Sequence, residues 1–250
     1  MEFKNKRVVI TGGAGDIGAE TARQFLKEGA RVLLVDLKEK DLKATKKKLK
    51  SKNCFIQVAD VTKADQVKAY VKAAKEKLGG IDVFFNNAGI EGPVKPIVEY
   101  TEKEFEQVLN VNVLGVWLGL KYVMKAMGKK GGSIICTSSV AGQGGTPGVS
   151  GYVASKHAVV GLMRVAALEG AASGIRVNTI HPSPVEGRMM ESLEDGMGGK
   201  NTKKQLEQSI PLGRYAKQAD VAHLVLFLAG KRASFLTGGE FNVDGGMSAK

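Results

Sequence analysis

Short apolar runs alternate with longer amphipathic stretches along almost the whole chain. The apolar runs predict strands at Arg7–Thr11, Arg31–Val35, Cys54–Val58, Ile81–Phe85, Ser133–Thr137, Ile175–Ile180 and Glu240–Val243. The stretches between them predict helices at Asp16–Glu28, Lys63–Leu78, Glu102–Met127, Ser150–Ser173 and Gln218–Ala229, with a lysine-rich helix after the second strand. Residues 183–210 are rich in Gly and Met and are predicted to be irregular.

Strands and helices that alternate at this spacing indicate a parallel sheet with helices on both faces. The strands are almost entirely apolar, as expected for strands that are covered on both sides. The chain has 250 residues and no Pro- or Ser-rich linker. It therefore predicts one α/β domain over residues 1–250, a doubly wound Rossmann-type fold with a mostly parallel seven-stranded sheet. Ligands are expected outside the carboxyl ends of the strands, where the strand order reverses.

Composition and charge narrow the class of protein. No stretch reaches the roughly 18 apolar residues of a membrane span, so a cytoplasmic protein with no membrane partner is expected. Cys54 and Cys136 lie in apolar runs and are expected to be buried free thiols. The formal net charge is +12, but many lysines gather in the stretch 38–52 around a thin apolar stripe. This pattern indicates a solvated helix, and no nucleic-acid partner is expected.

A glycine-rich turn follows the first strand and precedes a helix. In the stretch from Thr11 to Gly18, the residues Gly13, Gly15 and Gly18 satisfy the pattern GxGxxG. Such glycines allow a tight turn and a close approach of the backbone to a pyrophosphate, which the helix N-terminus attracts. The pattern predicts a dinucleotide-binding loop; the alternative is a glycine-rich turn without a ligand.

Asp36 follows the second predicted strand. A carboxylate at this position accepts hydrogen bonds from the adenosine ribose hydroxyls and repels a 2′-phosphate, so NAD is predicted over NADP. Lys38 lies close by in the sequence and weakens this preference. The alternative role for Asp36 is to cap the next helix.

Tyr152 and Lys156 are spaced i,i+4 on a predicted helix, which places them on one face. A phenol titrates near pH ~10, but a nearby ammonium lowers its pKa. The pair is therefore predicted to exchange a proton with an alcohol or carbonyl oxygen. Alone this spacing is a weak signal, because Tyr and Lys meet in this way on many helices.

Besides the glycine loop, Asp36 and the Tyr152/Lys156 pair, the chain contains further motifs. They are Asp60-Val61, Asn86-Asn-Ala-Gly89, Asn112, Ser138-Ser139, the stretch Arg176–Pro182, Thr237-Gly238 and the stretch Val243–Gly246. Over essentially its whole length the chain resembles the short-chain dehydrogenase/reductase family, in the subgroup with chains of about this length. The resemblance implies an enzyme that transfers a hydride between NAD(H) and a secondary alcohol or ketone.

The resemblance also implies a role for each matching residue. Tyr152 is the acid/base, and Lys156 lowers its pKa and holds the nicotinamide ribose. Ser139 binds the substrate oxygen, and Asn112 holds a water that connects Lys156 to solvent. The residues expected to bind the cofactor are Gly12, Gly15, Asp16, Ile17, Gly18, Asp36, Leu37, Asp60, Val61, Asn87, Ala88, Gly89, Tyr152, Lys156, Pro182 and Val185.

Three positions depart from the family pattern. Asp16 replaces a glycine of the usual loop TGxxxGxG, and a carboxylate near a pyrophosphate is unfavourable unless it points away or caps the helix. Ser183-Pro184 follows Pro182 where the family usually has Gly first. Gly187 stands where the family often has a Thr that binds the carboxamide or a phosphate, so one contact is expected to be lost or moved to Arg188.

The residues expected near Tyr152 are mainly small or apolar, which favours a cyclic or hydroxysteroid-like secondary alcohol over a sugar phosphate. The segment 183–210 is hypothesised to be a mobile lid over the substrate. Its apolar residues Met189, Met190, Leu193 and Met197 suit irregular apolar ligands, although ordinary packing is the alternative. The histidines are scattered along the chain, so no metal site is expected.

Two other functions stay open. One is a 3-oxoacyl-carrier-protein reductase that uses NADPH, for which a basic surface suits an acidic carrier; Asp36 argues against it. The other is a non-catalytic dinucleotide-binding regulator, and the complete set of catalytic residues argues against that. The family also implies a homotetramer or a homodimer, and the apolar stretches Val108–Val123 and Val153–Leu168 suit helix packing between subunits.

Overall fold

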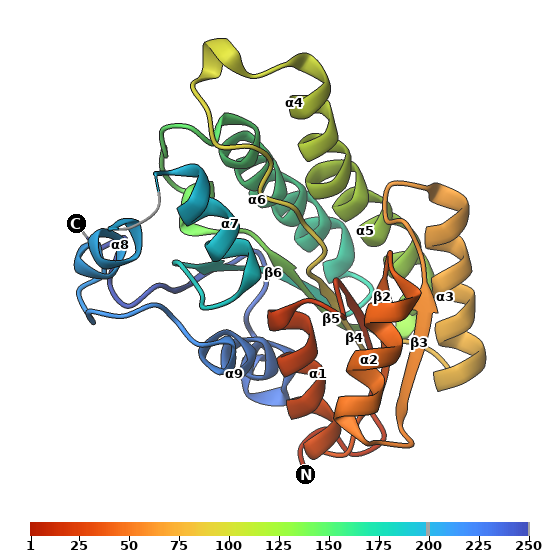
Figure 1. The fold of residues 1–250 in the computed structure, drawn as a ribbon. Helices are drawn as coiled ribbons and strands as arrows, with labels where there is room; N and C mark the ends of the chain where they lie inside the picture. Colours follow the sequence, from red (N-terminus) through yellow and green to blue (C-terminus); the bar gives the residue numbers. More distant parts are fainter. Residues whose placement is uncertain (199–200, 250) are drawn as a thin grey trace.

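The strands form one parallel sheet in the computed structural model, which describes residues 1–198 and 201–249 (Figure 1). Within these residues the strands are β1 (Arg7–Thr11), β2 (Arg31–Asp36), β3 (Cys54–Val58), β4 (Val83–Asn86), β5 (Gly132–Thr137), β6 (Ile175–Pro182) and β7 (Glu240–Val243). Their order is β3-β2-β1-β4-β5-β6-β7. Every neighbouring pair is parallel, which confirms the predicted doubly wound fold.

Helices cover both faces of this sheet. In the described residues they are α1 (Asp16–Lys27), α2 (Glu39–Leu49), α3 (Ala64–Leu78), α4 (Glu102–Leu109), α5 (Gly115–Met127), α6 (Ser150–Ala171), α7 (Arg188–Gly196), α8 (Thr202–Ser209) and α9 (Gln218–Ala229). Strand residues alternate between two cores: Val8 and Ile10 face one core, and Val9 faces the other. Helices α1, α2 and α9 close the first core, and α3, α5 and α6 close the second.

The strand order reverses between β1 and β4. From β1 the chain builds outward to β3, and it then returns to place β4 on the other side of β1. The carboxyl ends of these two strands are joined by Thr11, whose Oγ1 accepts hydrogen bonds from the backbone N–H groups of Asn87 (2.9 Å) and Ala88 (3.1 Å). This reversal point is where open α/β sheets bind ligands.

The helical region predicted over Glu102–Met127 is confirmed with the same bounds, but it contains a π-helical turn at Asn110–Leu114 between α4 and α5, which the apolar pattern did not reveal. One prediction of secondary structure was wrong. The segment predicted to be irregular, 183–210, contains α7 and α8, while 199–200 lie outside the described residues. Met189, Leu193 and Met197 follow one another at four-residue spacing, the signature of one helix face.

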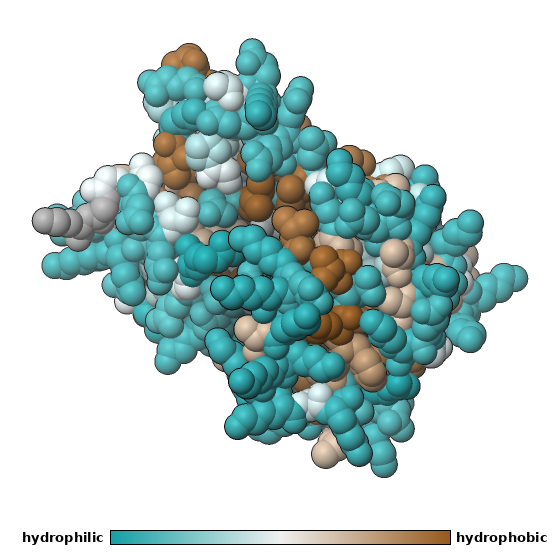
Figure 2. All heavy atoms as spheres, turned by 45° about the vertical axis from the view of Figure 1, so that its right-hand side comes forward, coloured by the Kyte–Doolittle hydropathy of each residue, from teal (hydrophilic) through white to brown (hydrophobic). Residues whose placement is uncertain are grey.

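The surface agrees with the interpretation of the charge. The lysines between 38 and 52 are all exposed, and α2 buries only Leu42 and Thr45. Figure 2 shows a largely hydrophilic face with a column of hydrophobic residues down its middle.

Cys54 and Cys136 are buried free thiols, as predicted. Among the described residues, none of the helices has the length and apolar character to cross a bilayer.

Candidate active site

The fold brings the sequence-predicted residues together along one edge of the sheet. The glycine loop follows β1, Asp36 ends β2, Asp60 follows β3, and the stretch 87–89 follows β4. Ser139 follows β5, and Pro182 ends β6. Because the strands are parallel, their carboxyl ends all lie at this edge. Tyr152 and Lys156 join them from the first turns of α6.

The glycine loop is shaped by two close approaches. Gly12 adopts φ +63°, and a Cβ there would lie 3.0 Å from Asn87 Nδ2. A Cβ at Gly18 would lie 2.2 Å from the carbonyl oxygen of Gly12, so the loop can fold onto α1 only with glycine there. Helix α1 begins after Gly15 without a side-chain cap. Its first amide N–H groups have no intrahelical acceptors, so they are suited to donate hydrogen bonds to an anion.

Asp36 is held beside this loop. Its Oδ2 accepts a hydrogen bond from Ala14 N–H (3.0 Å), and its Oδ1 accepts one from Leu37 N–H (2.8 Å). Helix α2 has Lys38 as its N-cap residue and shows no side-chain capping bond, so Asp36 does not cap α2. Since each carboxylate oxygen keeps a free lone pair, Asp36 can still accept bonds from ribose hydroxyls. Leu37 is 59% exposed next to it, an apolar side chain open to a ligand.

Asp16 does not cap its own helix. Its Oδ2 instead accepts a hydrogen bond of 3.1 Å from the backbone N–H of Arg188, the first residue of α7. A carboxylate in the glycine loop would be unfavourable if it pointed at a bound pyrophosphate, but Asp16 is hydrogen-bonded to α7 instead. The charge is directed at another helix N-terminus, where a carboxylate is favourable.

Lys156 is almost completely buried, with 4% of its surface exposed. Its Nζ donates a hydrogen bond to the carbonyl oxygen of Thr137 (2.9 Å) and lies 5.3 Å from the centroid of the Tyr152 ring. The predicted i,i+4 pair therefore does form one cluster. The Ser138 hydroxyl donates to the carbonyl oxygen of Lys156 (2.9 Å) and so ties α6 to the end of β5.

The pKa values of the pair differ from the prediction. Burial raises the pKa of Tyr152 to about 12, although a hydrogen bond to Ser139 acts to lower it. Burial also lowers the pKa of Lys156 to about 8. The predicted lowering of the Tyr152 pKa by the ammonium was wrong for this structure, because the cost of removing the phenolate from water is larger. A neutral phenol at pH ~7 is suited to donate a proton.

Asn112 is fully buried in the π-helical turn. Its Oδ1 accepts from Ile90 N–H (2.9 Å), and its Nδ2 donates to the Ile90 carbonyl (2.9 Å) and to Ser155 Oγ (3.0 Å). A Cβ at Gly89 would lie 3.2 Å from Asn112 Oδ1 and 3.5 Å from Lys156 Nζ. The asparagine therefore clamps the loop after β4 close to Lys156. π-Helical turns often occur at functional sites.

Three supporting residues were missed by the sequence reasoning. Thr11 joins the ends of β1 and β4, and the carbonyl of Thr137 holds Lys156. His181 is buried, and its Nδ1 is hydrogen-bonded to the carbonyl oxygen of Ser139 (2.9 Å). The desolvation of the imidazole lowers the pKa of His181, so it is neutral at pH ~7. All three residues lie at or near strand ends, and this position could have indicated a role in the site. Their hydrogen-bond partners are far away in the sequence, so the contacts themselves could not be predicted.

The other predicted cofactor residues lie at the ends of β3 and β6. Asp60 Oδ1 accepts hydrogen bonds from the Thr62 backbone N–H (2.9 Å) and from its hydroxyl (2.8 Å). Val61 Cγ2 lies against Gly115 of α5. Val185 forms an isolated bridge with Ala216. The hydroxyl of Ser183, just after β6, is buried and has no hydrogen-bond partner within the described part of the chain.

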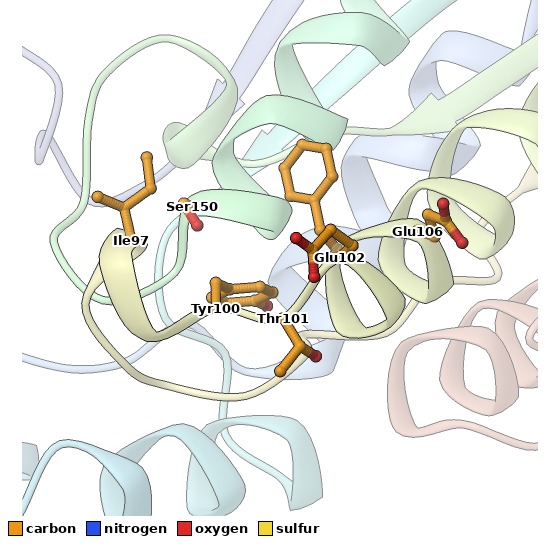
Figure 3. A pocket seen from close by; sticks show the side chains of 7 residues that line it. Ile97, Tyr100, Thr101, Glu102, Glu106 and Ser150 are labelled. Atoms are coloured by element: carbon orange, nitrogen blue, oxygen red, sulfur yellow. The ribbon is translucent and has the colours of Figure 1, made fainter.

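A separate pocket lies outside this edge, between α4 and the start of α6 (Figure 3). It is lined by Ile97, Tyr100, Thr101, Glu102, Phe105, Glu106 and Ser150. None of the predicted catalytic or cofactor residues lines it, so the chemistry belongs to the strand ends. The described residues also contain no group of three His, Cys, Asp or Glu side chains arranged to hold a metal ion.

A doubly wound sheet, a glycine loop at its reversal point, and a Tyr–Lys pair whose lysine is buried together define a dinucleotide-dependent oxidoreductase. A family model described as enoyl-(acyl carrier protein) reductase matches residues 12–248. The chain belongs to the short-chain dehydrogenase/reductase family and is an oxidoreductase that acts on CH–OH groups.

Its relatives include alcohol- and ketone-converting enzymes. Levodione reductase from Leifsonia aquatica is 40% identical over 99% of this chain and 96% of its own. A 3-alpha-(or 20-beta)-hydroxysteroid dehydrogenase from Mycobacterium bovis is 38% identical over 98% of this chain and 90% of its own.

Solved structures agree with this relationship. The crystal structure of levodione reductase has a TM-score of 0.94 at 39% identity, with 99% of each chain covered. The structure of NAD+-bound xylitol dehydrogenase has a TM-score of 0.91 at 31% identity, covering 97% of this chain and 98% of that chain. A 3-ketoacyl-(acyl-carrier-protein) reductase from Brucella melitensis, complexed with NADH, has a TM-score of 0.90 at 29% identity, covering 98% and 99%.

Proposed function

We propose that this chain is an NAD(H)-dependent oxidoreductase that interconverts a secondary alcohol and a ketone, with Tyr152 as its acid/base. The observation that carries the proposal is the cluster of half-buried Tyr152 and Ser139 with buried Lys156, next to a glycine loop that ends in an uncapped helix. Spectrophotometric oxidation of NADH at ~340 nm with a panel of ketones tests it directly. Binding of NADH without turnover on the whole panel would support the non-catalytic regulator instead.

The residues at the site fit a dinucleotide. The free N–H groups at the start of α1 suit the pyrophosphate, and Asp36 suits the adenosine ribose. Asp60 and Val61 would contact the adenine, and the stretch 87–89 would lie along the adenosine ribose and the phosphates. The backbone of Pro182–Val185 would meet the nicotinamide carboxamide. When bound, the nicotinamide supplies or accepts the hydride.

Side chains of the protein transfer the proton that accompanies the hydride. In the direction of reduction, the Tyr152 hydroxyl donates its proton to the carbonyl oxygen as the carbonyl carbon receives the hydride, and the ketone becomes an alcohol. Ser139 holds the same oxygen by a hydrogen bond. Lys156 stabilises the phenolate that remains, and Asn112 connects Lys156 to a water that returns the proton. In the direction of oxidation each transfer is reversed.

The charge of Asp36 is expected to set the cofactor preference. Asp36→Asn keeps an acceptor for Ala14 N–H and removes the charge that repels a 2′-phosphate. We expect the ratio of NADPH to NADH affinity to rise by at least about tenfold, as measured by nicotinamide fluorescence titration. Asp41→Asn, an exposed carboxylate in the first turn of α2, is the matched control. An unchanged ratio would contradict the assignment of NAD specificity to Asp36.

The substrate is proposed to be a cyclic or hydroxysteroid-like secondary alcohol or ketone. The support is the adaptable apolar side chains of Met189, Met190, Leu193 and Met197 on α7 and just beyond it, which form the proposed lid together with α8. Levodione and a 20-keto steroid are the first compounds to assay, because two relatives carry those substrate classes in their names. Conversion of open-chain polyols alone would contradict this substrate class.

A 3-oxoacyl-carrier-protein reductase is the second candidate. The neighbouring structure of such an enzyme is a complex with NADH, so Asp36 by itself does not separate the two functions. The exposed lysines of α2 suit an acidic carrier protein. Reduction of acetoacetyl-carrier protein with a higher kcat/KM than levodione would favour this candidate.

We also propose a cytoplasmic homotetramer, with a homodimer as the alternative. Large apolar side chains are exposed on the two helices that sequence reasoning assigned to the interface: Trp117 on α5, and Val165 and Leu168 on α6. Leu168 is 82% exposed, which suits burial by a second copy. Multi-angle light scattering should give a tetramer for the wild type and smaller species for Leu168→Glu.

A further inference from the structure

Two positions that depart from the family pattern lie in contact, although they are distant in the sequence. Asp16 is the first residue of α1, and Gly187 directly precedes α7. Asp16 Oδ2 accepts the backbone N–H of Arg188 at 3.1 Å. A Cβ at Gly187 would lie 2.3 Å from the same oxygen, and Gly187 adopts φ +130°. The carboxylate therefore occupies space that any other residue at 187 would fill.

The contact with Asp16 supplies a hydrogen-bond acceptor for the N-terminus of α7, which has no side-chain cap of its own. Gly187 is the N-cap residue of α7 and has no side chain to bond the first amide N–H groups. Asp16 brings an acceptor from another element, and its negative charge is favourable at a helix N-terminus. The start of α7 is thus capped from the glycine loop.

The other end of α7 reaches the substrate side of the site. A Cβ at Gly196 would lie 2.7 Å from Val94 Cγ2, in the loop after β4. Val94 Cγ1 in turn lies near Gly148, four residues before Tyr152. Between these ends, the Tyr215 hydroxyl donates to Glu194 Oε1 at 2.9 Å. Helix α7 therefore spans the site from the glycine loop to the surroundings of Tyr152.

We propose that Asp16 is a positioning residue that pins the first turn of α7 to the glycine loop and so holds this helix over the substrate, with Gly187 leaving room for the carboxylate. The inference rests on the proposed function of α7 as part of a substrate lid. It links the nucleotide-binding loop to substrate binding through one hydrogen bond.

Limited trypsin digestion of the ligand-free protein tests the pin itself. Arg188 is exposed, and cleavage after it requires the first turn of α7 to open. We expect Asp16→Ala to release the fragment ending at Arg188 about fivefold faster, as followed by mass spectrometry. Asp16→Asn keeps an acceptor and should stay close to the wild type. Asp65→Ala, in the first turn of α3, is the control. An unchanged rate for Asp16→Ala, or equal rates for the Ala and Asn variants, would overturn the proposal.

A double-mutant cycle tests the pairing. Gly187→Ala should accelerate the same cleavage in the wild type for two reasons: its Cβ displaces the carboxylate, and a backbone φ of +130° disfavours any side chain. In the Asp16→Ala background only the backbone strain remains, so Gly187→Ala should have a smaller effect there on a logarithmic scale. Additive effects would overturn the contact as the cause.

Kinetics separate this inference from the proposed function. In Asp16→Ala we expect KM for levodione, measured at saturating NADH, to rise about three- to fivefold with kcat nearly unchanged. A fall in kcat with unchanged KM would overturn the positioning role. If the wild type does not reduce levodione, the proposed substrate fails, while the trypsin result still decides whether Asp16 holds α7.

Discussion

Tyr152→Phe is expected to lower kcat/KM for ketone reduction by about 10³-fold or more while the protein still binds NADH. The substitution removes only the hydroxyl that donates the proton. The ring stays beneath the ammonium of Lys156, which lies 5.3 Å from its centroid, so the packing of the site is kept. Initial rates with NADH and levodione, together with fluorescence titration of NADH, measure both quantities.

Tyr122→Phe is the matched control for this variant. Tyr122 lies on α5, where its ring is close to the ammonium groups of Lys68 and Lys121 rather than to the strand ends. It should retain the wild-type rate. If Tyr152→Phe kept more than about a tenth of the activity, general acid catalysis by this residue would be wrong.

Lys156→Met is expected to lower kcat by about 10²-fold or more without a comparable loss of stability. The ammonium is desolvated, and the fall of its pKa to about 8 shows that the fold disfavours the charge. A methionine of similar length fills the same space without a buried charge, which offsets the loss of the hydrogen bond to the Thr137 carbonyl. Lys47→Met, on the exposed face of α2, serves as the control.

Lys156→Met also tests the lowered pKa of Lys156 through the pH dependence of the unfolding free energy. The pKa of Lys156 is lowered from 10.5 to about 8 on folding, so the unfolded chain binds this proton more tightly. Between pH ~8 and ~10 the unfolded state therefore holds more protons, and the wild type gains stability as the pH rises. Lys156→Met lacks this contribution. The difference in unfolding free energy between wild type and variant should move in favour of the wild type from pH ~8 to ~10, as measured by urea denaturation.

A pH-independent difference would mean that Lys156 keeps an ordinary pKa in the folded protein. Groups common to both proteins cancel in this comparison, including Tyr152, whose raised pKa acts mainly above pH ~10. The stability test does not depend on any substrate, so it examines the electrostatics of the site separately from its chemistry.

Much of the architecture could be predicted because it depends on local patterns. Each central strand is an apolar run, and the helices α1, α2, α3, α5, α6 and α9 each bury apolar residues in one of the two cores. Motifs placed after strands could be assigned to one edge, since parallel strands share their carboxyl ends. For the same reason Gly12, Asp36 and Ser139 could be grouped without coordinates. The helix α7 was missed because the glycines and methionines of the segment 183–210 were interpreted as irregular structure, although Met189, Leu193 and Met197 have helical spacing.

The chain alone thus determined the fold class, the position of the glycine loop and the candidate catalytic residues, because these follow from periodicity and from motifs in a known order. Only the tertiary structure decided the environment of each group. The pKa of Tyr152 rises rather than falls because burial depends on residues from several elements. Likewise, Asp16 and Gly187 became partners only when α7 was placed against the glycine loop. Desolvation and long-range contacts are properties of packing, and no local sequence pattern contains them.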